Sequence, residues 1–190
     1  MLLGVLALQG DSREHIELLG TLGVAALPVK ASEDLESVDA LVIPGGESTT
    51  ISKLLEIFEL LDPVRDFAKS KPVLGTCAGL ILLSDKVEGL LEGQQLIGGL
   101  PITSSRNAYG GQLDSFEAEV GFSSGASENV AFIRAPKILD AGSCEVLARL
   151  GSEIVAVRHE NLFGATFHPE LTGGTHLHKL FVEFVKAASN

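Results

Sequence analysis

The pattern of apolar and polar positions changes about halfway along the chain. In the first half, short apolar runs typical of buried strands alternate with longer segments whose apolar residues recur at helical spacing. The expected strands cover 2–8, 24–29, 39–43 and 72–75, and the expected helices cover 12–22, 48–60 and 62–69, with another beginning at Ala78. Because strands that alternate with helices pair in parallel, the pattern predicts an α/β fold with helices on both faces of a mostly parallel sheet.

The second half contains closely spaced strand-like segments instead. They cover 115–121, 130–135, 145–150, 154–159 and 162–167, and an amphipathic helix follows from about 175 to 188. Such spacing is typical of antiparallel hairpins, which we expect to complete the sheet. No linker, low-complexity tract or internal repeat interrupts the sequence, which predicts a single domain over residues 1–190.

Charge and cysteine content exclude several classes of function. The net charge is −11, and no basic patch could replace the counterions of a nucleic acid. Two cysteines cannot form a disulfide framework and suit a reducing compartment, which predicts a cytoplasmic protein. No positive charge precedes the apolar run 2–8, so we interpret it as the first strand rather than a signal peptide, and no segment is long enough to span a membrane.

Cys77 lies on a predicted sharp turn between the strand 72–75 and the following helix. Gly75 and Gly79 flank it, as expected where strand and helix backbones nearly touch and leave no room for a Cβ atom. A cysteine at a helix N-terminus is well placed to form a thiolate. The pattern therefore indicates a nucleophile, although a lone cysteine after an apolar strand is usually a small core residue.

His168 and Glu170 supply the groups that such a nucleophile needs. Pro169 favours an extended His168 and is expected to prevent a helix there. In an extended segment residues i and i+2 share a face, so we expect the Glu170 carboxylate beside the imidazole of His168. Glu170 would hold one ring nitrogen protonated and leave the other to take the proton from Cys77.

A third motif, Pro44 to Thr49, follows the strand 39–43 and precedes a helix. Its two glycines can turn a backbone N–H into the site, and we assign the donors of an oxyanion hole to the N–H groups of Gly46 and Ala78. A glycine pair after a strand is also common in an ordinary turn, and Ser48 is expected to cap the helix in either case.

Four motifs fall at the carboxyl ends of predicted strands, where the ligand crevice of a parallel sheet lies. They are Gln9-Gly10, Gly45-Gly46, Cys77 and His168. Their convergence predicts one active site at this edge of the sheet.

Other polar residues have no predicted catalytic role. Asp11 and Glu14 suit a capping box on the first helix, and the sequence alone permits a simple surface position for His15. His176 and His178 are two apart in a helical segment, so they point to different faces and are expected in solvent rather than on a metal.

Gly-Thr-Cys-Ala-Gly at 75–79, taken with Phe-His-Pro-Glu at 167–170, resembles the class I (triad) glutamine amidotransferase family. The resemblance is closest to the branch that serves pyridoxal 5'-phosphate synthases, and it runs in order over nearly the whole chain. The segments that support it are 8–15, 44–50, 75–80, 106–110, 114–117, 132–136 and 167–172. It implies a flavodoxin-like three-layer fold, and hydrolysis of L-glutamine to L-glutamate and ammonia through a Cys-His-Glu triad and a glutamyl thioester.

The same resemblance implies a partner and a set of substrate contacts. Ammonia would pass to a pyridoxal 5'-phosphate synthase (lyase) subunit, and no cofactor or metal is implied for this chain. The residues implied to contact L-glutamine are Gly46, Glu47, Ser48, Arg106, Ile133 and Arg134. An amino-acid substrate needs cations for its carboxylate, which suits the arginines, and an acceptor for its ammonium, which suits Glu47. Either arginine alone could instead form a surface ion pair. Gly111 departs from the family's pattern, which usually has a longer polar side chain there.

Three other functions fit parts of this pattern. A thiol hydrolase or chaperone of related cysteine families would share the fold and turn, but those proteins tend to place histidine directly after the cysteine, where this chain has Ala78. A glutaminase of another synthase would share the triad without the Gln-Gly and Ile-Arg-Ala-Pro segments. A silent docking subunit would keep only the fold, and Cys77→Ala would then leave turnover unchanged.

Overall fold

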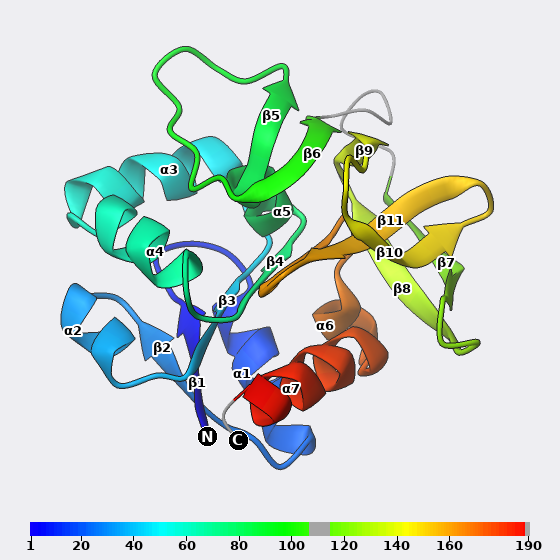
Figure 1. The fold of residues 1–190 in the computed structure, drawn as a ribbon, viewed down its shortest axis with the longest axis horizontal. Coiled ribbons are helices and arrows are strands. Elements are labelled where there is room, and N and C mark those ends of the chain that lie inside the picture. The colour runs from blue at the N-terminus through cyan, green and yellow to red at the C-terminus, as the bar shows by residue number, and fades with distance from the viewer. Residues whose placement is uncertain (107–114, 189–190) are drawn as a thin grey trace.

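A nine-stranded mixed sheet forms the centre of the molecule, which a computed structural model describes for residues 1–106 and 115–188 (Figure 1). The strands are β1 (Leu2–Leu6), β2 (Ala25–Val29), β3 (Ala40–Ile43), β4 (Val73–Thr76), β7 (Ser115–Phe122), β8 (Ser127–Ile133), β10 (Glu145–Leu150), β11 (Glu153–His159) and β12 (Leu162–Ala165). Their order is β2-β1-β3-β4-β12-β11-β10-β7-β8. The segment 107–110, Gly111 and Asp114 lie outside the described residues.

The sheet is parallel at one end and antiparallel at the other, which confirms the predicted fold class. β2, β1, β3, β4 and β12 pair in parallel, in the order of a doubly wound flavodoxin-like sheet. β11, β10, β7 and β8 continue it as antiparallel pairs. β4 and β12 are direct neighbours, with Thr76 opposite Ala165. The segments that follow these two strands therefore leave the sheet side by side.

A second sheet of three strands, β5 (Ser84–Glu88), β6 (Leu100–Ser105) and β9 (Lys137–Asp140), is absent from the predicted elements. β6 pairs in parallel with β5 and antiparallel with β9. Most of β5 is exposed and charged, so it lacks the apolar alternation by which a strand is recognised.

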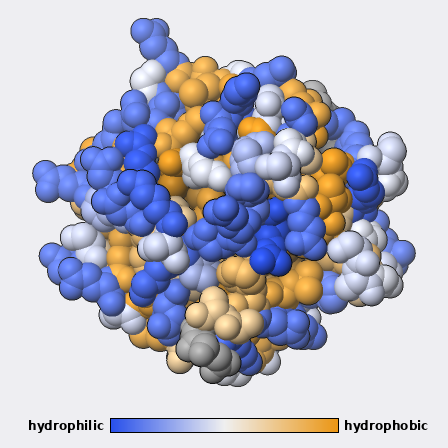
Figure 2. Space-filling model, in the orientation of Figure 1, coloured by the Kyte–Doolittle hydropathy of each residue, from blue (hydrophilic) through white to orange (hydrophobic). Residues whose placement is uncertain are grey.

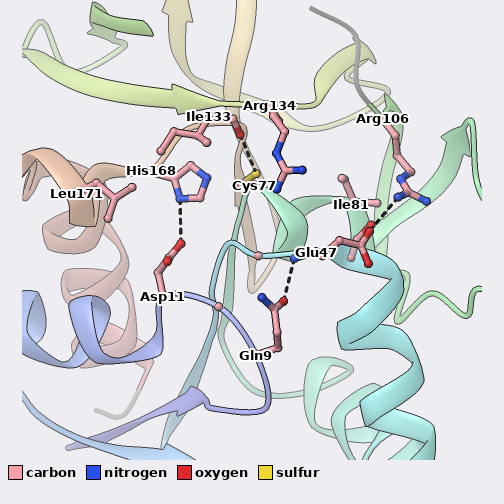
Figure 3. A pocket seen from close by; sticks show the side chains of 13 residues that line it. Gln9, Asp11, Glu47, Cys77, Ile81, Arg106, Ile133, Arg134, His168 and Leu171 are labelled. Atoms are coloured by element: carbon pink, nitrogen blue, oxygen red, sulfur yellow. Dashed lines mark hydrogen bonds and ion pairs between the residues drawn. The ribbon is translucent and has the colours of Figure 1, made fainter. Parts of the chain in front are cut away.

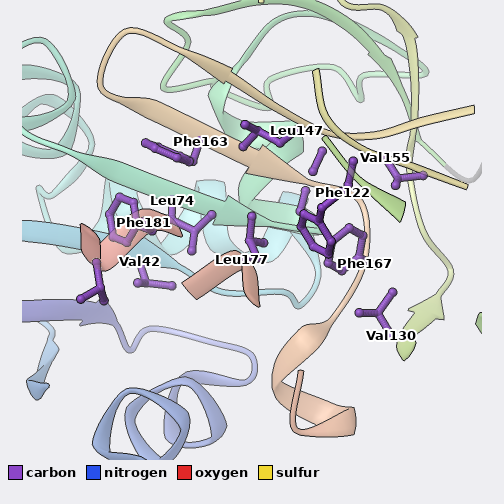
Figure 4. Packing of buried hydrophobic residues seen from close by; sticks show 14 of the residues in the cluster. Val42, Leu74, Phe122, Val130, Leu147, Val155, Phe163, Phe167, Leu177 and Phe181 are labelled. Carbon is purple, nitrogen blue, oxygen red and sulfur yellow. The ribbon is translucent and has the colours of Figure 1, made fainter. Parts of the chain in front are cut away.

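Helices cover both faces of the parallel strands, and each face has its own apolar core. α1 (Ser12–Thr21) and α7 (His176–Ala188) pack on one face, where Leu177 and Phe181 share a cluster with Val42 and Leu74 (Figure 4). α2 (Ser32–Glu36), α3 (Ser48–Ile57), α4 (Leu61–Ala68) and α5 (Ala78–Leu83) pack on the other face, together with the strand residues Leu41 and Val73. This alternation along β3 and β4 fixes which side chains face each layer of helices.

The predicted elements all begin and end within three residues of the observed ones. At two helix N-termini, however, the capping interactions differ from those predicted. Glu47, rather than Ser48, caps α3 by accepting hydrogen bonds from the N–H groups of Thr49 (3.2 Å) and Thr50 (2.7 Å). Asp11 precedes α1 without a side-chain cap bond, so the predicted capping box does not form. Both carboxylates lie in the cleft described below.

Hydrophilic side chains cover much of the face shown in Figure 2, with hydrophobic ones between them. Ile57 and Phe58, at the end of α3, are among the large apolar side chains that are exposed. Scattered exposure of this kind needs no functional explanation. Within the described ranges, no helix is long and apolar enough to cross a bilayer.

Candidate active site

Cys77 occupies the predicted turn between β4 and α5, in a backbone conformation that residues with a side chain rarely adopt (φ 48°, ψ −100°). Such a conformation costs about 1–3 kcal/mol and persists only where its surroundings hold it. Here the Cys77 N–H donates to the Ala165 carbonyl of β12 (2.8 Å), and the Cys77 carbonyl accepts from Ile81 of α5 (3.2 Å). The turn places the thiol at the carboxyl edge of the sheet (Figure 3).

Gly75 and Gly79 provide the clearance predicted for this turn. A Cβ atom on Gly75 would lie 2.5 Å from the carbonyl carbon of Gly79, and one on Gly79 would overlap the Ile43 carbonyl oxygen of β3. Both contacts are with backbone, which could move only by shifting a packed strand or helix. These glycines therefore allow α5 to start directly against β3 and β4.

His168 and Glu170 form a hydrogen-bonded pair at the same edge. The His168 Nδ1 and Glu170 Oε1 atoms are 2.7 Å apart, and both side chains are almost fully buried. One expectation was wrong: His168 is extended, but Pro169 begins the helix α6 (Pro169–Thr172) instead of preventing one. Proline suits the first helical position because an N–H there would have no partner within the helix. Glu170 therefore reaches His168 from the first turn of a helix.

Hydrogen bonding outweighs burial in setting the charge of His168. Burial disfavours the charged imidazole, but hydrogen bonds with Asp11, Cys77 and Glu170 raise its pKa to about 12. The Asp11 Oδ2 atom lies 3.4 Å from Nδ1 of His168. Burial raises the pKa of Glu170, against the opposing effect of its bond with His168. An imidazolium beside a cysteine is the pairing that activates a thiol for nucleophilic attack.

The Gly45-Gly46 peptide lies at the cleft from the end of β3. The Gly45 carbonyl accepts from the Asp11 N–H (3.3 Å), so the N–H of Gly46, on the opposite side of the same trans peptide, points away from Asp11. Among the residues that the structure describes, this N–H has no acceptor, nor has that of Ala78, the first residue of α5. Neither N–H is therefore occupied by another group of the described chain.

These elements surround a cleft of about 320 Å³. Its lining residues are Gln9, Gly10, Asp11, Gly46, Glu47, Ser48, Cys77, Ile81, Arg106, Ile133, Arg134, His168 and Leu171. The Cys77 sulfur lies 3.9 Å from the Ile133 carbonyl oxygen, which comes from β8 (Figure 3). Of the predicted site residues, Ala78 and Glu170 are buried beside the cleft rather than in its wall.

Arg106, just after β6, is held in the cleft by two acceptors. Its Nη1 donates to Gln94 Oε1 (2.7 Å) and its Nη2 to Glu47 Oε1 (3.1 Å). Partial burial opposes ionisation of Glu47, but hydrogen bonds from Thr50 and Thr49 outweigh it and lower the pKa of the carboxyl. A fixed guanidinium and a fixed carboxylate therefore lie together, as recognition of an amino acid requires.

Three residues that build the site have no specific contact or role assigned to them in the site from sequence, although Gln9-Gly10 is one of the motifs that predict its location. Gln9 accepts from the Glu47 N–H (2.8 Å), and Asp11 contacts His168. Gln94, nearly buried, donates to the Ser48 hydroxyl (3.2 Å) and so joins it to Arg106. Gln9 and Asp11 could have been found as polar residues that follow the first parallel strand, whereas Gln94 lies in an irregular segment without such a signal.

Asp11, His168 and Glu170 bring three atoms of the kinds that bind metals within 4.8 Å of one another. His168 Nδ1 already forms a hydrogen bond with Glu170. The cluster is therefore explained as one imidazole nitrogen, Nδ1, approached by two carboxylate acceptors.

Two histidines are buried: His178, which was expected in solvent, and His15, for which the sequence alone permits a surface position. His15, in α1, and His178, in α7, are 0% exposed. Each lies on a helix face that packs against the sheet. Burial could not be predicted from the residue type, because histidine is polar and is found both inside proteins and at their surfaces. His176 agrees better with expectation, since its Nε2 lies 2.9 Å from the exposed Ser124 hydroxyl.

The fold, with a cysteine turn at the carboxyl edge of its parallel strands, is that of the class I glutamine amidotransferases. A solved structure of a glutamine amidotransferase superposes on this chain with a TM-score of 0.91 and 44% sequence identity, covering 97% of this chain and 98% of that one. The model of the SNO glutamine amidotransferase family matches residues 5–187, and the chain belongs to this family.

Curated relatives of one kind match almost the whole chain. The sequence is 49% identical over 191 residues to pyridoxal 5'-phosphate synthase subunit PdxT of Streptomyces griseus, covering 98% of this chain and 97% of that protein. It is 46% identical over 191 residues to the subunit of the same name from Dehalococcoides mccartyi, covering 98% of each. A solved structure of PurLQS from Thermotoga maritima shares the fold at 15% identity, with a TM-score of 0.67 over 97% of this chain and 98% of that one.

Proposed function

We propose that this chain is the glutaminase subunit of a pyridoxal 5'-phosphate synthase, and that it hydrolyses L-glutamine through Cys77, His168 and Glu170. The main support is the strained turn that puts Cys77 in one cleft with His168, whose Nδ1 lies 2.7 Å from Glu170. An inert core thiol would need neither feature. The names of the relatives support the choice of synthase.

In the first half of the reaction, the Cys77 sulfur attacks the side-chain amide carbon of glutamine. His168 is the imidazolium that carries the proton of the thiol on Nε2, because Glu170 occupies Nδ1. The N–H groups of Gly46 and Ala78 stabilise the oxyanion that forms. The C–N bond then breaks, His168 returns the proton to the departing nitrogen, and ammonia leaves a glutamyl thioester on Cys77.

In the second half, water replaces the thiol. His168 takes a proton from the water as its oxygen attacks the thioester carbon, and the same two N–H groups bind the second oxyanion. The C–S bond breaks, the sulfur recovers the proton, and glutamate leaves. Glu170 keeps its bond to Nδ1 throughout and balances the charge of the imidazolium.

Glutamine would be held by its amino-acid end. Arg106 and Arg134 both line the cleft and suit the α-carboxylate, while Glu47 suits the α-ammonium. The backbone of Gly46 and Ile133 and the hydroxyl of Ser48 complete the wall. This arrangement leaves the side-chain amide directed at Cys77.

The ammonia is delivered to a synthase subunit bound over the cleft. A glycine-rich peptide can flip, so we expect docking of the partner to set the Gly45-Gly46 peptide and the isolated chain to have low activity. Both cysteines are free, which suits a reducing compartment such as the cytoplasm.

The test is ammonia release from L-glutamine by the purified chain, with and without a pyridoxal 5'-phosphate synthase subunit. Cys77→Ala removes the nucleophile, and Cys144→Ala is the matched control, because Cys144 lies outside the cleft. We expect release that requires Cys77, tolerates loss of Cys144 and rises with the partner. Release that survives Cys77→Ala, or none under either condition, would refute the proposal.

A further inference from the structure

Two buried histidines, His15 and His178, have no part in the mechanism above. They come from opposite ends of the chain, one in α1 and the other in α7, and both are 0% exposed. His15 Nδ1 lies 2.9 Å from His178 Nε2, and the ring centroids are 5.0 Å apart. Fully buried imidazoles are uncommon unless their nitrogens have partners, so the contacts of this pair need an explanation.

The pair leads to the oxygen of Glu170 that His168 does not use. His15 Nε2 lies 3.4 Å from Glu170 Oε2 and 3.2 Å from the hydroxyl of Thr76, the residue before the nucleophile. Oε2 is buried and has no hydrogen-bond partner of good geometry in the described part of the chain, so His15 Nε2, at ion-pair distance, is positioned to serve it after a small rotation. Glu170 Oε1 is the atom that binds His168 Nδ1. One carboxylate therefore bridges the two histidine systems.

The protons of this chain can be assigned from what each group can donate. An ionised carboxylate only accepts, so we assign the proton of His15 to Nε2, which faces Glu170 Oε2 and the Thr76 hydroxyl, and its Nδ1 then accepts from Nε2–H of His178. The opposite tautomer would aim a nitrogen lone pair at the carboxylate. His178 Nδ1 is left without a proton, and it has no partner among the described residues, as an acceptor can tolerate better than a donor.

Both rings are neutral in this arrangement. Burial lowers the pKa of His15 well below its usual range, and the neighbouring His178 and His168 lower it further. Burial alone lowers the pKa of His178 to about 4. The ionisable groups that face the pair are Glu170 and, beyond it, His168 with Asp11. A neutral His15 can donate to the Glu170 carboxylate without forming an ion pair with it. The negative charge of Glu170 is then left to stabilise the imidazolium of His168.

We propose that His15, oriented by His178, is a positioning residue that holds Glu170 Oε2 so that Oε1 stays on His168. The inference rests on the proposed glutaminase, because its effect on turnover acts through the proposed base. The inference also assigns the protonated ring nitrogen of His178 in α7 and of His15 in α1. These two tautomers can be measured without any substrate.

The matched variants are His15→Gln and His15→Asn. A glutamine amide can place its nitrogen near the position of Nε2, whereas the shorter asparagine reaches only the position of Nδ1. We expect H15N to lower kcat about ten- to a hundredfold with little change in KM, by analogy with the outer-shell partners of metal-binding histidines, and H15Q to restore most of it. His176→Asn, at the surface of the helix that holds His178, is the control.

The pH dependence of Cys77 alkylation by iodoacetamide separates a positioning role from a loss of stability. A variant that only destabilises the fold should leave the pH midpoint of alkylation unchanged. A loosened Glu170 supports the imidazolium less well, so the midpoint of alkylation should move to higher pH in H15N, by on the order of half a unit or more, and less in H15Q. His178→Leu should move it in the same direction. An unchanged midpoint in folded H15N would overturn the inference.

Nitrogen-15 NMR of histidine-labelled wild-type protein tests the tautomers directly and needs no variant. We expect His15 and His178 to be neutral at neutral pH and protonated only on Nε2. A proton on Nδ1 of His15 would contradict the assignment. Neither the alkylation midpoint nor the histidine tautomers depend on glutamine turnover. Absence of Cys77-dependent ammonia release would therefore refute the proposed function, whereas the positioning role of His15 would still be tested by these two measurements.

Discussion

Glu170 contacts His168 across the boundary between an extended segment and a helix, with 2.7 Å between Oε1 and Nδ1. The two residues are neighbours because Pro169 lets the helix start at once, not because they share one face of a strand. The carboxylate is thereby fixed by the first turn of α6.

Glu170→Gln should leave the fold intact and lower kcat sharply. An amide keeps the shape of the side chain but cannot balance an imidazolium, and loss of the corresponding carboxylate in a related triad costs about 10⁴-fold. Steady-state ammonia release should show a fall of at least about a hundredfold in kcat with KM changed far less. Glu183→Gln, on the exposed side of α7, is the control. Equal activity of the two variants would exclude Glu170 from the mechanism.

Arg106→Gln should weaken binding of glutamine. A charge-assisted hydrogen bond to a carboxylate contributes about 1.5–3 kcal/mol, so KM should rise roughly ten- to a hundredfold. Arg149→Gln, whose guanidinium donates to the Ser152 carbonyl and does not line the cleft, should leave KM unchanged. A variant with normal KM and reduced kcat would instead assign Arg106 to the chemical step.

Gly79→Ala should destabilise the protein and inactivate it, because the added methyl group would overlap the Ile43 carbonyl. We expect a loss of about 1–3 kcal/mol in urea unfolding. Gly20→Ala is the matched control: it lies in α1 with nothing near its Cβ position, and the substitution should stabilise the helix by about 0.5–1 kcal/mol. Equal effects of the two variants would contradict the close approach.

Phe181→Ala should cost about 3–5 kcal/mol of unfolding free energy, since the ring is 0% exposed between α7 and the sheet. Phe58→Ala, 55% exposed at the end of α3, should change it by less than about 0.5 kcal/mol. Chemical unfolding of both variants compares the two sites directly, and a similar loss at Phe58 would show that its surface is packed.

Stability should fall on mild acidification because of the buried histidines. Burial holds the pKa of His178 at about 4, whereas the unfolded chain takes up this proton near pH 6.5. Its contribution is therefore fully present above about pH 6.5 and is lost as the pH falls toward 4, by up to about 1.4 kcal/mol per pH unit. His168, whose pKa is raised, has the opposite slope above pH 6.5.

Comparison with His178→Leu isolates this effect. Urea unfolding at about pH 7.5 and 5.5 should give a smaller difference between the two pH values in the variant than in the wild type. His176→Asn should behave like the wild type. A variant with the wild-type pH dependence would show that His178 is not buried in its neutral form.

The parallel half of the fold was predictable because each of its strands is a short, mostly apolar run. The motifs at the ends of those strands predicted where Cys77 and His168 lie. The small sheet was not predictable, because the side chains of β5 are largely charged and exposed and its pairing with β6 depends on the surrounding fold. The local order of apolar and polar residues does not predict which strands pair.

The chemistry around the helix starts was the least predictable part. Asp11 has the sequence signature of a cap, but its carboxylate lies beside His168 instead. His15 and His178 are 163 residues apart, and only the packing of the first helix and the last against one face of the sheet brings them together. Contacts between residues so far apart in the sequence cannot be predicted from the spacing of neighbouring residues.

The pairing of β4 with β12 has a consequence for how the enzyme comes into being. The strand that ends at the nucleophile has its neighbour about ninety residues later in the chain, and the Cys77 N–H is bound by that neighbour. Long-range parallel pairs form late in folding, because a large loop must close before they gain any contact. During synthesis Cys77 thus emerges well before His168, its proposed base, and the proposed catalytic pair forms only when most of the protein is already folded around it.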